Sequence, residues 1–282
     1  MQDSAFKLKS SPQARFLIYA IMWMGTVVVL LPLVWLLSTS LKTQIDLTSN
    51  VWGPPRTLAI ENYTNAWTKS NMGIYVRNSF YVVIITVIIT LIGATTISFA
   101  LSRIKFATNR LIYYIVISGM FIPIQAIIIP LYINASQLNL QNNLTALAFI
   151  YAASRIPISV FILESYMQTI PLEIEQSATI DGCGPYRLFT DIMIPLSKDG
   201  IIMVIILSLL ACWNELIVSL VMISKPLLKT LPIGLMQFVS EFNTEYTQLC
   251  AALLLSCIPN ILFYALLQEK IIKGMTMGAI KG

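Results

Sequence analysis

Long apolar runs alternate with short polar segments along the whole chain. Each run has about the 20 residues that an α-helix needs to cross the hydrocarbon core of a bilayer. The runs cover residues 16–39, 79–101, 111–133, 144–167, 200–222 and 246–267. This pattern predicts an all-α integral membrane protein with six transmembrane helices. Pro123 and Pro130 fall inside the third run, where we expect them to bend the helix.

The polar segments give the expected division of the chain. We predict an N-terminal segment, a first span, a long loop, a core of five further spans and a C-terminal tail. Their ranges are 1–15, 16–39, 40–78, 79–267 and 268–282. Within the core, residues 171–200 form the longest polar interruption on the predicted inner side.

Composition agrees with a membrane protein and excludes a soluble domain with an ordinary surface. The 282 residues are 57% hydrophobic and 11% charged, and the mean hydropathy is +0.77. The net charge of +5 is small and is better explained by membrane topology than by nucleic-acid binding. Eleven of the 18 lysines and arginines lie in segments 1–15, 102–110, 171–200 and 268–282. The positive-inside rule therefore places both termini and the 171–200 loop in the cytoplasm.

The sequence offers no catalytic or metal-binding constellation. It has no histidine, and its four cysteines lack the spacing of a disulfide framework or a zinc site. The phosphate-binding pattern G-x-x-x-x-G-K-[ST] does not occur. We therefore predict that the chain is not an enzyme and binds no cofactor. If transport is driven by ATP, another chain hydrolyses it.

Asn214 and Glu215 are adjacent polar residues deep in the fifth apolar run. An ionisable group facing lipid costs about 2.5–3.5 kcal/mol on insertion scales, so each must face water or a partner helix. Two interpretations remain open. The pair lines a translocation pathway or gate, or it holds helices together by hydrogen bonds.

The 171–200 loop is predicted to form two short helices joined by a tight turn. Pro171 suits a first helical turn, and Glu173 and Glu175 follow near the positive helix end. Gly182 then closes the helix in a left-handed cap. The second helix has an apolar face at helical spacing and is expected to end at Pro195; the face consists of Leu188, Phe189, Ile192 and Met193. A membrane protein rarely needs such a unit for its own fold, so we interpret it as a docking element.

This loop resembles the EAA loop of bacterial ABC importer membrane subunits. The pattern E-A-A-x-x-x-G corresponds to residues 176–182, and the following I-x-L-P to residues 192–195. Gln176, Ser177 and Ile194 depart from the family pattern but keep size or polarity. Residues 40–43, 62–63, 78–79, 122–125, 129–132 and 213–215 are similar to carbohydrate importers, and residues 274–282 resemble the tail of the maltose-transporter G-type subunit. The resemblance covers nearly the whole chain.

The resemblance implies a type I ABC importer permease fold with cytoplasmic coupling helices, in a bacterial cell membrane. It assigns coupling to an ATPase subunit to Glu173, Glu175, Ser177, Ala178, Asp181 and Gly182. It assigns a further ATPase contact to Gly278, Lys281 and Gly282. The implied partners are a second homologous permease, two ATPase subunits that carry ATP and Mg²⁺, and an extracytoplasmic sugar-binding protein. That protein would meet the outer loops 40–78 and 223–245. Polyol or glycerol phosphate uptake occurs within the same family.

A secondary transporter of a small polar solute is the alternative from another class. It would need a buried carboxylate relay, for which Glu215 is the candidate. This alternative leaves the 171–200 loop unexplained.

Overall fold

The computed structural model describes residues 12–239 and 245–279, with side chains as far as residue 265. Over these residues it contains helices and no strand. Four of the described helices are long and apolar enough to cross a bilayer, and six spans result if each of two sharply bent helix pairs counts as one. The predicted all-α membrane architecture is confirmed. The chain divides into two compact units, residues 1–66 with 238–255 and residues 67–237 with 256–282.

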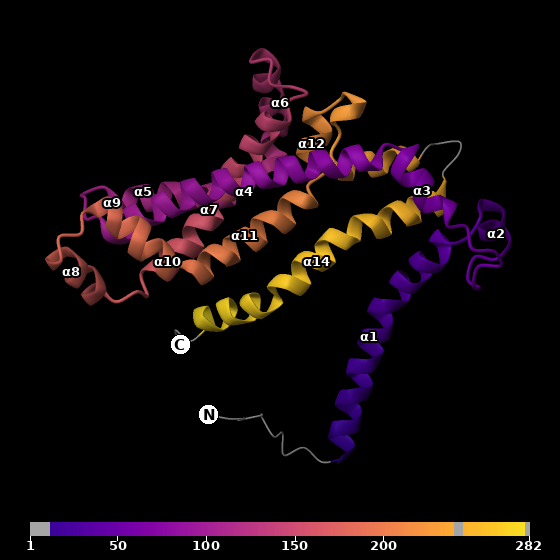
Figure 1. Ribbon diagram of the computed structural model, residues 1–282, viewed down its shortest axis with the longest axis horizontal. Helices are drawn as coiled ribbons and strands as arrows, with labels where there is room; N and C mark the ends of the chain where they lie inside the picture. The colour runs from indigo at the N-terminus through magenta and orange to yellow at the C-terminus, as the bar shows by residue number, and fades with distance from the viewer. Residues whose placement is uncertain (1–11, 240–244, 280–282) are drawn as a thin grey trace. The chain divides into compact units, whose positions relative to one another are not determined.

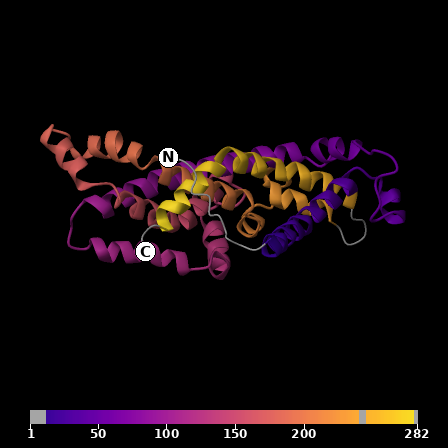
Figure 2. The ribbon, with the colours of Figure 1, turned by 90° about the horizontal axis from the view of Figure 1, so that it is seen from below.

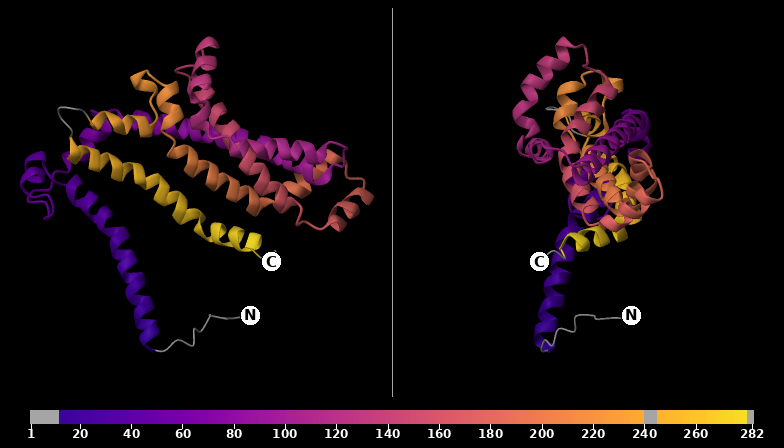
Figure 3. Two further views of the ribbon diagram at one scale, coloured as in Figure 1. Left: turned by 180° about the vertical axis from the view of Figure 1, so that it is seen from behind. Right: turned by 90° about the vertical axis from the view of Figure 1, so that its left-hand side faces the viewer.

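Three helices form the core of the larger unit. They are α4 (Met72–Arg103), α7 (Leu144–Met167) and α11 (Lys198–Trp213). They run side by side in Figures 1 and 3. The residues that they bury together are aliphatic: Ala94, Leu101, Val160, Leu163 and Val204. Close packing of this kind makes the three helices one body, because a well-packed interior transmits displacement instead of absorbing it.

Buried hydroxyl groups add hydrogen bonds between α4 and α7. Thr86 Oγ1 donates to the carbonyl of Ala148 at 3.2 Å, and Ser98 Oγ donates to that of Val160 at 3.3 Å. Small hydroxylated residues allow helices to approach closely in a membrane, and the bond removes the cost of burying the hydroxyl.

The third apolar run is sharply bent. It folds as α5 (Asn109–Ser118), η1 (Gly119–Phe121), η2 (Ile124–Ile127) and α6 (Ile128–Gln137). The halves 109–121 and 124–137 meet at 85°, a turn seen from another side in Figure 2. The bend lies at Pro123, which lacks an N–H and holds Ile122 in an extended conformation. The bend expected at Pro130 is wrong: this proline lies in the first turn of α6, where a missing N–H has no helical partner to lose.

The fifth apolar run is interrupted too. After α11 ends at Trp213, three residues lie outside any helix before α12 (Ile217–Met222) begins. The expectation of one continuous helix over residues 200–222 is therefore wrong, and the interruption contains Asn214 and Glu215.

The polar loop between α7 and α11 carries four short elements. They are α8 (Leu172–Ile180), α9 (Pro185–Arg187), the π-helical turn η3 (Leu188–Met193) and α10 (Ile194–Leu196). Figure 1 shows α8 at the extreme end of the larger unit. The helical path 185–196 meets α11 at 73°.

The other end of the larger unit is closed by η4 (Pro226–Leu228) and α13 (Leu231–Leu235). Asn78 Nδ2, on α4, donates to the carbonyls of Leu227 at 2.9 Å and Lys229 at 3.0 Å. Ser79 Oγ accepts from the backbone N–H of Leu231 at 2.8 Å. These bonds fix the segment after α12 onto the first turns of α4, which begins at Met72, ahead of the span expected at 79–101.

The smaller unit contains α1 (Pro12–Ser40), α2 (Gln44–Ser49) and the first turns of α3 (Glu61–Thr68). The short helix η5 (Met236–Phe238) ends in this unit, and α14 (Tyr246–Ala279) begins in it and continues into the larger one. No residue of the apolar window of α1 is buried. Such a face suits lipid or another membrane helix.

Candidate functional site

The helix α8 ends in a glycine cap, as the sequence predicts. Gly182 has φ +81°, a left-handed conformation that costs other residues about 1–2 kcal/mol. Its N–H donates to the carbonyl of Thr179 at 3.0 Å, and the N–H of Cys183 donates to that of Ala178 at 2.9 Å. These two bonds make a Schellman motif. The cap turns the chain sharply without leaving the last helical carbonyls unpaired.

The six predicted coupling residues do not share one face of α8. Glu175 and Ala178, three residues apart, are partly buried, whereas the other four are exposed: Glu173, Ser177, Asp181 and Gly182. Apolar side chains are exposed beside them. Ile180 is 85% exposed and Tyr186 is 77% exposed. The outer face of the loop is therefore a mixed apolar and acidic surface.

Arg103, the last residue of α4, holds α8 from the inner side. Its Nε lies 2.7 Å from Oε1 of Glu175, and the two side chains are 5% and 14% exposed. Its Nη2 donates to the carbonyls of Met167 and Ile170, at and just beyond the end of α7. Sequence reasoning counted Arg103 only as a loop charge, and no motif signalled its partner.

Three of the four residues of the predicted apolar face in the second half of the loop pack into one cluster, and the fourth, Ile192, is partly buried. Phe189 and Met193, with Leu188, contact a small cluster formed by Phe99, Met167 and Ile170. The rings of Phe99 and Phe189 are 5.1 Å apart, centre to centre. The expected end at Pro195 is wrong by one residue, because α10 continues to Leu196. The π-helical turn η3 ends at Met193, two residues before this proline, and α10 follows it directly.

Glu215 accepts hydrogen bonds from two elements at the break after α11. Tyr151 of α7 donates its hydroxyl to Oε2 at 2.6 Å. The N–H of Val218 donates to Oε1 at 2.9 Å, and the N–H of Ser219 to Oε2 at 3.2 Å. The carboxylate thus caps the N-terminus of α12, where the helix dipole favours a negative charge. This gives the physical reason for the break.

Asn214 has different partners from its neighbour. Its Nδ2 donates to the carbonyl of Leu210 at 2.8 Å, and its Oδ1 accepts from Asn260 Nδ2 of α14 at 3.3 Å. The structure brings Asn214 and Glu215 to one break but links them to different helices. Both contacts are of the helix-joining kind, and the pathway role stays a prediction.

The predicted C-terminal contact falls mostly outside the described residues. Gly278 lies in the last turn of α14, and Lys281 and Gly282 lie outside the described residues.

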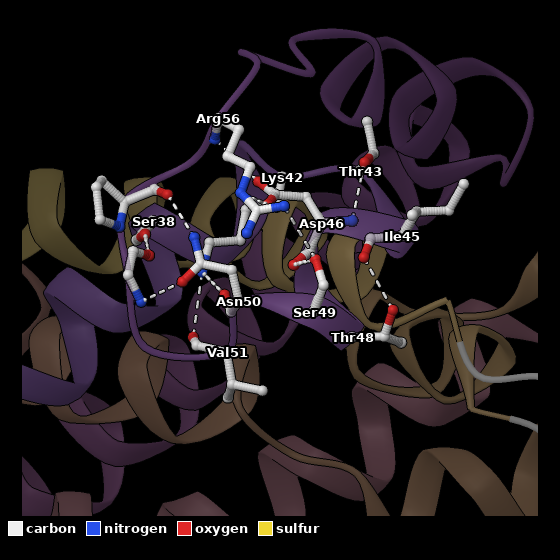
Figure 4. Close-up of polar contacts among 12 residues, drawn as sticks. Ser38, Lys42, Thr43, Ile45, Asp46, Thr48, Ser49, Asn50, Val51 and Arg56 are labelled. Carbon is white, nitrogen blue, oxygen red and sulfur yellow. Dashed lines mark hydrogen bonds and ion pairs between the residues drawn. The ribbon is translucent and has the colours of Figure 1, made fainter.

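A polar cluster that sequence reasoning did not assign lies in the smaller unit, between α1 and the loop after α2 (Figure 4). Lys42 is completely buried, and its Nζ donates to the carbonyls of Asn50 at 2.7 Å and Val51 at 3.1 Å. Asp46 accepts from the N–H of Arg56 at 2.9 Å. The Ser40-to-Thr43 stretch had been noted only for its resemblance. The cluster gives the start of the 40–78 loop a fixed shape.

Within the part of the chain that the structure describes, no group of three histidine, cysteine or acidic side chains is placed to hold a metal ion. The four cysteines are free thiols.

Comparison with known proteins gives one family. Residues 93–276 match the family model described as "Binding-protein-dependent transport system inner membrane component". The chain is 40% identical to a putative ABC transporter permease protein, ORF2, of Caldicellulosiruptor sp. (strain Rt8B.4), over 95% of this chain and 96% of that protein. It is 29% identical to the diacetylchitobiose uptake system permease protein NgcG of Streptomyces coelicolor, over 93% and 88%.

A solved structure has the same fold. It is a chain of a bacterial ABC transporter involved in the import of the acidic polysaccharide alginate, with a TM-score of 0.82 and 20% sequence identity. The match covers 92% of this chain and 98% of that one.

Proposed function

This chain belongs to the binding-protein-dependent transport system inner membrane component family, and from that premise we propose that it forms half of the translocation pathway of an ATP-driven sugar importer. It is a multi-pass membrane permease with the ABC importer permease fold.

The exposed outer face of α8 is the main support for coupling to an ATPase. This face is exposed, carries Glu173 and Ile180, and lies at the extreme end of the larger unit. A short exposed helix with apolar and acidic side chains, closed by a glycine cap, can occupy a groove of a soluble partner. We therefore assign α8 to docking on a separate ATPase subunit, which supplies ATP and Mg²⁺. Two ATPase copies would serve this chain and a second, homologous permease.

A sugar substrate is supported by the relatives. Their names include diacetylchitobiose uptake, transport of starch degradation products and transport of arabinooligosaccharides. A related alginate transporter was crystallised in complex with a pentasaccharide-bound periplasmic protein. By analogy we propose an oligosaccharide substrate, delivered by an extracytoplasmic binding protein to the outer loops of this chain.

The orientation follows from charge. With both termini and the α8 loop in the cytoplasm, the lysine and arginine excess lies on the inner side. The Lys42 cluster and the segment after α12 that is hydrogen-bonded to Asn78 then lie on the outer side, where a binding protein would arrive.

Reconstituted uptake tests the proposal. Vesicles would contain this chain, its companion permease and the ATPase, with the binding protein outside and ATP inside. Labelled chitobiose, maltotriose and arabinotriose would serve as probes. We expect uptake only when every component and ATP are present. Uptake by this chain alone, driven by an ion gradient, would instead establish a secondary transporter.

A further inference from the structure

One guanidinium group joins three separate segments of the larger unit. Arg103 ends α4, its Nη2 donates to the carbonyls of Met167 and Ile170, and its Nε faces the carboxylate of Glu175 on α8. The carbonyls belong to the end of α7, where helical partners are missing, so a cation is favourable there. The planar guanidinium reaches the two carbonyls through Nη2 and the carboxylate through Nε, two separate nitrogens that the single ammonium nitrogen of lysine does not offer.

Glu175 is thereby assigned a role that differs from that of Glu173. Both lie in the first turn of α8, yet Glu175 is 14% exposed and paired, whereas Glu173 is exposed on the opposite side. A mostly buried carboxylate that already has an arginine partner is poorly placed to contact an ATPase. Its contact is inward, to α4.

The pair connects α8 to the rigid core. Leu101, two residues before Arg103, is buried against α7 and α11 with Leu163 and Val204. Residues 168–171 otherwise link α8 to α7 by a short stretch of chain. Such a link transmits a push along its length but resists rotation poorly. The ion pair adds a second, lateral attachment to α4.

We propose that Arg103 is a positioning residue that, through Glu175, makes α8 move as one body with the inner ends of α4 and α7. This inference rests on the proposed function of α8 as the ATPase dock. It separates two tasks on one short helix: the outer face binds the ATPase, and the Arg103–Glu175 pair passes the movement on. Without the ion pair, α8 still binds the ATPase but can rotate without moving the membrane-spanning helices.

The test measures labelled sugar uptake per ATP hydrolysed in vesicles containing the complete complex. Four chains are compared with the wild type: Arg103→Gln, Glu175→Gln, the double variant, and Lys105→Gln as the control that removes an exposed charge two residues from Arg103. Co-purification of the ATPase and the amount of inserted complex are recorded for each. The double variant removes both charges, so it leaves no unpaired ion even if a single variant inserts poorly.

We expect each single variant to lower uptake per ATP by about fivefold or more, the lower range of measured coupling between sites, while the ATPase still co-purifies. The double variant should fall no further than the singles, because the two residues act as one unit. Lys105→Gln should keep the wild-type ratio. This inference would be overturned, and the proposed function would stand, if the double variant kept the wild-type uptake per ATP. The same holds if the double variant lost as much uptake per ATP as the two single losses multiplied together. Absence of ATP-driven uptake in the wild type would overturn the proposed function, and this inference with it.

Discussion

Gly234 of α13 lies directly against the ring of Tyr75 on α4, so that an added β-carbon would stand 2.1 Å from Cδ2 of that ring. Tyr75 is almost completely buried, and its hydroxyl donates to Gln237 Oε1 at 3.1 Å. Because the Tyr75 ring is buried and hydrogen-bonded, it cannot easily move away from a side chain added at position 234. The glycine is what lets the segment after α12 close over the start of α4.

Gly234→Ala should therefore destabilise the protein. Overpacking a closed contact costs about 1–3 kcal/mol, and we expect the midpoint of thermal unfolding of the purified protein in detergent to fall. Gly25→Ala is the control, because nothing lies within 4 Å of its added β-carbon and alanine favours the helix α1. An unchanged midpoint for Gly234→Ala would show that Tyr75 moves aside at little cost.

A graded series at Gly182 tests the left-handed cap of α8. Nothing lies within 4 Å of its added β-carbon, so substitutions act through the backbone conformation alone. Gly182→Asn should be tolerated, since asparagine enters this conformation readily, whereas Gly182→Ala should lose about 1 kcal/mol or more of cap stability. ATPase co-purification should follow the same order.

Gly184→Ala is the matched control for this series, because Gly184 has φ −76° and open space around it. Weaker ATPase binding in Gly184→Ala than in Gly182→Ala would contradict the cap as the cause. Gly182→Asp, which adds a charge beside Asp181, should reduce transport while the chain still inserts into the membrane.

The pair of Tyr151 and Glu215 can be separated into structural and pathway roles. Tyr151→Phe removes one hydrogen bond to a carboxylate, worth about 1.5–3 kcal/mol, but leaves the two backbone bonds that cap α12. If Glu215 only caps the helix, Tyr151→Phe should lower thermal stability while sugar uptake by the folded complex stays normal. Uptake that falls at unchanged stability would instead support the predicted pathway role.

The boundaries of the 171–200 loop could be predicted because particular residue types mark them. Pro171 and Gly182 act locally, through a missing N–H and a left-handed backbone, and the sharp bend at Pro123 has the same kind of cause. Such signals need no knowledge of the surrounding fold.

The break after Trp213 could not be predicted, because no proline or glycine marks it. It depends on Glu215 capping α12 and on a hydrogen bond from Tyr151 on a different helix. The pairing of Arg103 with Glu175 likewise requires α4 and α7 to be packed first. In both cases the charged residue was visible in the sequence, but its partner is set by tertiary structure.

Lys42 is buried at the start of the 40–78 loop of the smaller unit. Lys42→Met keeps the apolar stem but removes the donor to the carbonyls of Asn50 and Val51. The carbonyl of Val51 keeps a hydrogen bond from Trp35 Nε1 at 3.2 Å. The carbonyl of Asn50 is therefore the acceptor that the substitution affects most. An unsatisfied buried acceptor costs about 1–3 kcal/mol, and the loop should open more often. Trypsin cleavage after Arg56 should therefore be about tenfold faster for each 1.4 kcal/mol lost. Lys69→Met, at an exposed position, is the control, and equal cleavage rates in the two variants would show that Lys42 does not hold this loop closed.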